Sequence, residues 1–194
     1  MTEITAIEAR RIFDSRGQPT VEVEMTTYDG RVTASVPAGT STGEREAKSV
    51  DAKHAVKNIN EVIAQKIVGM DSSAQREIDT KLCELDGTHD KGRLGANALL
   101  GVSVAAVKAN AMRMRQDVYE YIFEMVKNDK KRLPLPYILM AEAGKHSSSN
   151  IAIQEFMLIP KLNNFSKSFN VSLKIYHELG KIMEKRNMNI NVGY

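Results

Sequence analysis

The sequence has a single cysteine, no long apolar run and little net charge, and each of these absences excludes a class of protein. Cys83 is the one cysteine in 194 residues, which excludes an intramolecular disulfide and fits a reducing compartment, so we interpret the protein as cytoplasmic. No apolar run is long enough to span a bilayer, and we expect no membrane partner. Residues 1–12 are charged and lack an apolar core, so we expect no secretory signal.

The net charge of +3 comes from scattered lysines and arginines and is only a weak argument for an anionic partner. The basic run at 130–132 is too short to predict nucleic-acid binding. Small anionic metabolites remain compatible with this charge. Hydrophobic residues make up 42% of the chain and charged residues 26%, which is typical of a soluble globular protein.

Apolar residues alternate with polar ones near the N-terminus, and this period predicts strands. The three alternating groups are Ile4, Ala6, Ile12 and Phe13; Val21, Val23 and Met25; and Val32, Ala34 and Val36. Between the second and third groups, Gly30 tolerates positive φ and Asp29 can bond its own backbone, so a hairpin turn is expected. The pattern predicts a three-stranded antiparallel meander.

After Gly43 the apolar period becomes that of helices. The predicted helices span 51–68, 72–87, 95–115 and 117–126. Their inward residues are Val56, Ile59, Ile63 and Ile67; Ile78, Leu82 and Leu85; and Val118, Ile122 and Val126. Ser72 and Gln75 have the spacing of a capping box, which predicts the start of the second helix. The third is rich in Ala and Val on nearly all sides, as expected of a helix buried in the middle of a domain.

The second part of the chain begins after a solvated linker at 128–132, where the residues LPLP at 133–136 mark a boundary. A buried strand is expected at 151–159, followed by a helix at 165–185. The inward residues of this helix are Phe169, Leu173, Tyr176 and Ile182. The fold class is therefore α+β, with a domain at 1–132 and the start of a larger strand-helix pattern at 133–194. We expect the second part to be the less stable, or to pack on the first domain or on another chain.

Four separated blocks carry the possible function, although each has a simpler explanation. They read DSRGQPTVEV at 14–23, VPAGTSTG at 36–43, DGT with GANALLGVS at 86–88 and 95–103, and IAIQEFMLIP at 151–160. Taken singly, the first is a turn, the second a polar loop, and the third a packing helix. In the last block a carboxylate, Glu155, stands in an apolar strand, and burying a charge is costly unless it is paired. Glu155 is therefore the residue least explained by core filling.

In this order the four blocks resemble the enolase family over essentially the whole chain. The resemblance implies an N-terminal α+β domain at 1–132 and the beginning of an α/β barrel at 133–194. It also implies a lyase that interconverts 2-phosphoglycerate and phosphoenolpyruvate plus water with Mg²⁺. By the same resemblance, Ser41 is a magnesium ligand, and His146, Gln154 and Glu155 contact the substrate, with Glu155 beside the acid-base groups.

The chain departs from the family pattern at two places. Residues 142–145 read EAGK where the family has NGGS, and after Ala47 the residues KSV at 48–50 replace an acidic run. In the family, the base, the acid and the principal magnesium carboxylates follow the position of Gly193. We therefore expect that the chain is inactive alone. The alternative is a non-catalytic interaction protein that pairs with full-length enolase through the N-terminal domain, since family enolases are homodimers. A gene product without a selected role is a third interpretation.

Overall fold

The computed structural model describes residues 2–39, 42–127, 130–143, 153–188 and 190. The chain divides into two compact units, Met1–Asp129 and Lys130–Tyr194. The sequence predicts this division three residues later, after residue 132. Each unit has its own sheet.

The first unit begins with the predicted meander of three antiparallel strands. They are β1 (Ile4–Phe13), β2 (Pro19–Thr27) and β3 (Gly30–Val36), in the order β1-β2-β3. Tyr28 and Asp29 form the turn between β2 and β3, and Gly30 closes it with a φ of 138°, a conformation that favours glycine. The α+β class and the sheet topology expected from the sequence are confirmed.

The two faces of this sheet differ in chemistry, as the alternation in β2 requires. Val21, Val23 and Met25 are buried on the inner face. On the outer face, Arg10 pairs with Glu22 at 2.6 Å and with Glu24 at 3.4 Å. Glu24 also pairs with Arg31 of β3 at 3.2 Å. The outer face of the sheet is therefore crossed by a ladder of opposite charges.

The helix predicted at 51–68 is present as three consecutive pieces. They are α1 (Ala52–Asn58), a π-helical turn η1 (Ile59–Ile63) and α2 (Ala64–Ile67). Asp51 caps its start by accepting from the backbone N–H groups of Lys53 and His54. Within the π turn, the Asn60 amide binds both backbone groups of Ala9, at 2.7 and 3.1 Å. Asn60 thus covers part of the free edge of β1.

The next helix, α3, spans Gln75–Asp86, and its predicted capping box is wrong. Ser72 is 2% exposed, its N–H donates to Thr2 at 2.7 Å, and its carbonyl accepts from Asn110. Gln75 turns instead to the helix α4 (Ala96–Met114), where its amide donates to the Ser103 hydroxyl at 3.1 Å. Tertiary hydrogen bonds take both predicted capping residues, so the helix starts three residues later than the sequence indicated. Its end at Gly87, with a φ of 69°, agrees with the prediction.

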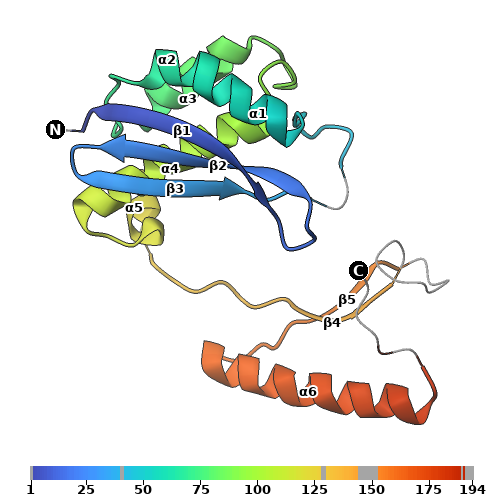
Figure 1. Cartoon of the computed structure of the whole chain (residues 1–194). Helices are drawn as coiled ribbons and strands as arrows, with labels where there is room; N and C mark the ends of the chain where they lie inside the picture. The colour runs from blue at the N-terminus through green and yellow to red at the C-terminus, as the bar shows by residue number, and fades with distance from the viewer. Residues whose placement is uncertain (1, 40–41, 128–129, 144–152, 189, 191–194) are drawn as a thin grey trace. The chain divides into compact units, whose positions relative to one another are not determined.

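The central helix α4 (Ala96–Met114) is buried along most of its length, as its Ala and Val content predicted. It packs against β2 and β3, while α1, η1 and α2 lie against β1 (Figure 1). Gly101 permits this approach, because a Cβ there would lie 2.6 Å from Val23 of β2. The helix α5 (Val118–Met125) packs on α4, yet none of its residues is fully buried. Its predicted stripe of Val118, Ile122 and Val126 is therefore only partly covered.

The core of the first unit combines side chains from all of these elements except α5. Its members are Ile4, Ile7, Val21, Val23, Met25, Ala34, Val36, Ala55, Ile59, Ile63, Ala64, Ile67, Ile78, Leu82, Leu94, Ala98, Leu99, Val102, Ala105, Ala106 and Ala109. Most members from α4 are small alanines, and most members from the sheet are branched. This combination allows close packing of a helix on a sheet.

The second unit contains an antiparallel pair, β4 (Ile138–Glu142) and β5 (Glu155–Leu158), followed by α6 (Phe165–Lys185). The bounds of α6 are those predicted from the sequence, whereas β4 was not predicted. The sequence also predicted a buried strand at 151–159, and this is wrong for the described part: β5 is shorter, and none of its residues is fully buried. Residues 151–152 lie outside the described residues.

The predicted inward face of α6 is also wrong. Its members Phe169, Leu173, Tyr176 and Ile182 are 40–49% exposed, whereas Ser168 and Ser172 are buried. The cause is the small number of neighbours within this unit, where α6 contacts β4. None of the described helices is both long and apolar enough to cross a membrane.

Candidate functional site

The predicted site residues fall in two segments, one in each unit. The first segment follows β3 and was expected to bring Ser41 to a magnesium ion. Ser41 lies outside the described residues, but both of its flanks are described. On one side, the Arg16 guanidinium donates to the carbonyl of Ala38 at 2.7 Å. On the other, the Glu46 carboxylate accepts from the N–H of Gly43 at 3.0 Å.

Arg16 belongs to the turn between β1 and β2, and Asp14 organises this turn. The Oδ1 atom of Asp14 accepts from the N–H groups of Arg16, at 2.9 Å, and of Gln18, at 2.8 Å. Its Oδ2 atom pairs with the Arg16 guanidinium at 3.2 Å. The Gln18 and Arg16 N–H groups lower the pKa of Asp14, against a smaller opposing effect of burial. The turn therefore holds an ionised carboxylate in contact with the Arg16 guanidinium.

The second segment contains the remaining predicted residues. His146 lies outside the described residues, and Gln154 and Glu155 are exposed at the start of β5. The Gln154 carbonyl accepts from the N–H of Ala143 at 2.8 Å. Glu155 is paired across the ladder with Glu142 of β4. The expected burial of the Glu155 carboxylate is wrong for this structure, because water reaches the strand that was predicted to be enclosed.

Gln154 and Glu155 are neighbours in the sequence, where Gln154 immediately precedes β5 and Glu155 is the first residue of that strand. The structure does not relate them to the segment around Ser41, which belongs to the other unit. Within the described ranges, no group of three or more His, Cys, Asp or Glu residues is placed to hold a metal ion. Magnesium prefers several oxygen ligands in near-octahedral geometry, so the described side chains do not by themselves form a magnesium site.

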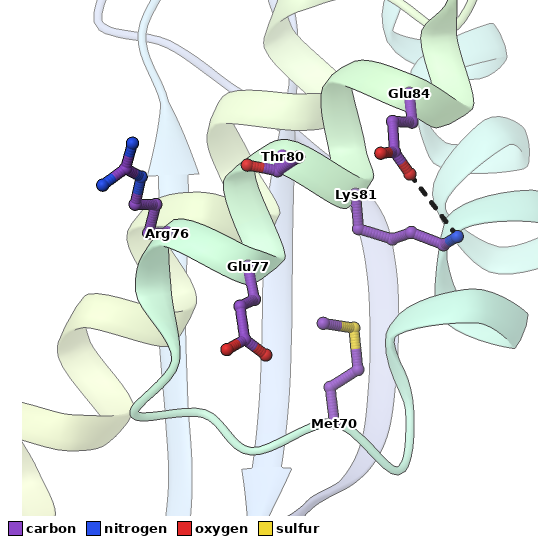
Figure 2. Close-up of a pocket in the computed structure, with 6 residues that line it drawn as sticks. All are labelled: Met70, Arg76, Glu77, Thr80, Lys81 and Glu84. Atoms are coloured by element: carbon purple, nitrogen blue, oxygen red, sulfur yellow. Dashed lines mark ion pairs between the residues drawn. The ribbon is translucent and has the colours of Figure 1, made fainter.

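A shallow hollow lies elsewhere on the first unit, between α3 and the chain preceding it. Figure 2 shows its lining, and Lys81 and Glu84 form an ion pair across 3.6 Å there. The lining residues are Met70, Arg76, Glu77, Thr80, Lys81 and Glu84. None of the predicted site residues belongs to this set. Its charges of both signs do not favour one class of ligand, and we assign no function to the hollow.

Comparison with known proteins matches both units in chain order. Residues 4–122 match the enolase N-terminal domain, and residues 130–194 match the enolase C-terminal TIM barrel domain. The chain belongs to the enolase family. The described fold is the α+β N-terminal domain of this family, followed by elements from the start of its barrel domain.

Curated enolases align along nearly the whole chain. The enolase of Methanothrix thermoacetophila is 42% identical over 205 residues, which cover 99% of this chain and 48% of that protein. The enolase of Bdellovibrio bacteriovorus is 41% identical over 206 residues, which cover 100% of this chain and 48% of that protein. The chain thus spans about half the length of the curated relatives it matches.

The structural role of Arg16 was not predicted, because the block at 14–23, taken singly, was interpreted as a turn. A signal was present in the sequence: an Asp two residues before the Arg can accept from its N–H in an Asx turn, and Gly17 follows with a φ of 71°. The partner carbonyl at Ala38 is 22 residues away and carries no side-chain signal. That part of the arrangement was visible only in the folded chain.

Proposed function

We propose that these 194 residues serve the enolase reaction, the interconversion of 2-phosphoglycerate and phosphoenolpyruvate plus water, and that they do not catalyse it as a separate polypeptide. The observation that carries the proposal is the ordered match of one chain to the N-terminal domain and to the barrel domain of enolases. Inactivity is supported by alignment to 48% of each curated relative, since their other half has no counterpart in these residues.

Within this proposal, Ser41, His146, Gln154 and Glu155 have separate roles. Ser41 offers one neutral hydroxyl oxygen to Mg²⁺, while the other three contact substrate, and Glu155 stands beside the acid-base groups. Removing a proton next to a carboxylate builds up negative charge, so the reaction needs a strong base as well as electrostatic stabilisation. One hydroxyl and one exposed carboxylate supply neither in full, and metal binding by these residues alone is weak.

A second candidate is a non-catalytic role in which the chain pairs with a full-length enolase. Apolar side chains exposed in the second unit favour it, because contiguous apolar surface marks a binding face. They include Tyr137, Phe156, Phe165, Phe169 and Tyr176, each more than 40% exposed. In this role the surface of the chain matters and its site residues do not.

The two candidates are separated by an assay of 2-phosphoglycerate dehydration in excess Mg²⁺, followed by the ultraviolet absorbance of phosphoenolpyruvate. The purified chain is measured alone and mixed with a full-length enolase that keeps its barrel but lacks its loop serine. We expect no turnover by the chain alone. Turnover in the mixture that disappears with Ser41→Ala supports participation in the reaction, and Ser35→Ala on β3 is the matched control.

Turnover by the chain alone contradicts the proposed inactivity. A mixture without turnover, in which sedimentation nevertheless shows a stable complex, supports the interaction role. A mixture without turnover and without a complex rejects both candidates for these 194 residues.

A further inference from the structure

Arg16 connects two parts of the first unit that are distant in the sequence. Its Nη2 atom lies 2.7 Å from the Ala38 carbonyl and 3.5 Å from the Gly39 carbonyl, across 22 and 23 residues. The donor stands in the turn after β1, and the acceptors stand in the segment after β3. A planar guanidinium suits this position because it offers several donors in a fixed geometry.

The Asp14 carboxylate restrains the direction of the Arg16 side chain by an ion pair of 3.2 Å. This carboxylate accepts two backbone N–H groups of its own turn, and its side chain is 9% exposed. Asp14 and Gln18 close the turn with a backbone hydrogen bond of 2.9 Å, and Gly17 donates to Asp14 at 3.0 Å. Charge-assisted contacts are stronger than neutral ones, so the half-buried, ionised Asp14 restrains the guanidinium.

The segment that Arg16 reaches has left the sheet. The β2–β3 ladder ends at the pair of Val21 with Val36, where the Thr20 hydroxyl donates to the Val36 carbonyl. Pro37 follows and has no N–H to extend the ladder. Ala38 and Gly39 are exposed, and their carbonyls receive the Arg16 guanidinium in place of a neighbouring strand.

The other end of the same segment is also held by a charged side chain. The Glu46 carboxylate accepts from the Gly43 N–H, and the Glu46 N–H donates back to the Gly43 carbonyl at 3.1 Å. Two residues on, Lys48 is tied to Asp90 by a backbone bond of 2.7 Å and an ion pair of 2.7 Å. The two ends of the segment are therefore anchored independently, and removing one anchor leaves the other in place.

We propose that Arg16 is a positioning residue, whose guanidinium fixes the backbone at Ala38 and Gly39 and so sets where the segment ahead of Ser41 leaves the sheet. Arg16 acts through backbone carbonyls and touches no reacting atom. The consequence for catalysis rests on the proposed function, because it requires Ser41 to serve the enolase reaction. The positioning itself does not depend on it.

The test measures backbone order in the full 194-residue chain by ¹⁵N NMR relaxation. In the parent chain, we expect the order parameter of the Gly39 amide to be about 0.85, the value of a rigid backbone. Arg16→Ala is expected to lower this order parameter below about 0.6. Gly43, anchored by Glu46, keeps its order parameter. Arg31→Ala is the matched control, since Arg31 is an exposed arginine of the same sheet that pairs with Glu24. Arg16→Lys restores part of the order at Gly39, because an ammonium can donate to one carbonyl.

Thermal unfolding of each variant separates positioning from general destabilisation. We expect Arg16→Ala to unfold at the temperature of Arg31→Ala. If Arg16→Ala lowers the unfolding temperature more than Arg31→Ala does, Asp14→Asn is measured instead. Asp14→Asn removes the ion pair with Arg16 but keeps an oxygen that accepts from the N–H groups of the turn. A loss of order at Gly39 alone in this variant supports the proposal. An unchanged Gly39 in both variants, or a Gly39 already flexible in the parent, overturns it. Because these measurements involve no turnover, neither result supports or contradicts the proposed role in the enolase reaction.

Discussion

At the scale of single residues, Asp86 organises the turn that leads from α3 to α4. Its side chain belongs to a residue only 1% exposed, and its two oxygens accept from Leu94 at 2.7 Å and from Thr88 at 3.0 Å. Burial raises the pKa of Asp86, but the Leu94 N–H and the Thr88 hydroxyl and N–H together bring it below its ordinary value. Asp86 is therefore an ionised carboxylate whose partners are two backbone N–H groups and one hydroxyl of the turn.

Asp86→Ala is expected to lower the free energy of unfolding by about 2 kcal/mol, because it leaves buried N–H groups without an acceptor. Glu84→Ala is the matched control, because it removes an exposed carboxylate of the same helix that pairs with Lys81 at 3.6 Å. We expect it to change the free energy of unfolding by no more than about 0.5 kcal/mol. Urea denaturation measures both. Equal losses for the two variants contradict the role assigned to Asp86.

Asp90 gives the first unit a defined sensitivity to acid. Lys48 and the Gly92 N–H lower the pKa of Asp90 to about 2, from an ordinary 3.8. The folded chain thus binds this proton less readily than the unfolded chain. The resulting stability is fully present above about pH 4 and is lost as the pH falls through about 2.

Asp90→Asn removes this contribution while keeping an oxygen for Gly92. We expect the parent chain to melt at a higher temperature than the variant above about pH 4, with the difference vanishing near pH 2. Added salt reduces the difference, because the pair with Lys48 is exposed. Melting curves across this pH range measure it, and a difference that grows toward low pH is the contrary result.

At the scale of elements, the contact of α4 with the sheet depends on Gly101. A Cβ at this position would lie 2.6 Å from Val23 and 3.3 Å from Val36. By contrast, a Cβ at Gly180 of α6 would meet no atom within 4 Å. The same substitution thus tests tertiary packing in one helix and intrinsic helix propensity in the other.

Gly101→Ala is expected to destabilise the first unit by about 1–3 kcal/mol, since overpacking outweighs the better helix propensity of alanine. Gly180→Ala is expected to stabilise α6 by up to about 1 kcal/mol and so to raise its helicity. Chemical denaturation followed by circular dichroism checks both directions. Stabilisation by Gly101→Ala would show that α4 is not held this close to β2.

The bounds of several elements were predictable from apolar periodicity. The start of α3 was predicted wrongly because hydrogen bonds to another element replaced the local ones. The bounds of α6 and the end of α3 follow from apolar spacing and from Gly87, which are local signals. The start of α3 does not, because Ser72 and Gln75 bond to Asn110 and Ser103 from α4. A capping box competes with such tertiary partners, and sequence spacing does not show which one forms.

At the scale of the whole molecule, burial is concentrated in the first unit. Every member of the main apolar core lies between Ile4 and Ala109, whereas the buried positions of the second unit include Ala143, Ser168 and Ser172. Local stability follows buried apolar contacts, so the two units should open with different free energies.

Hydrogen exchange measured by mass spectrometry is expected to show this difference. Amides of α4 exchange with a free energy close to that of global unfolding, and amides of α6 exchange sooner, by local opening. The comparison is made within one sample, so protein concentration and pH are shared. Equal protection of α4 and α6 would show that other contacts stabilise the second unit.

The sequence by itself determined the family, the meander, most helix bounds and the residues expected at the site, because these depend on local spacing and on motifs read along the chain. The tertiary structure decided which capping residues find other partners, how Asn60 covers β1, and how Arg16 reaches Ala38. It also showed Glu155 exposed, where the apolar strand pattern had predicted burial. Burial and long-range hydrogen bonds depend on which elements become neighbours, and no local pattern in the chain specifies that.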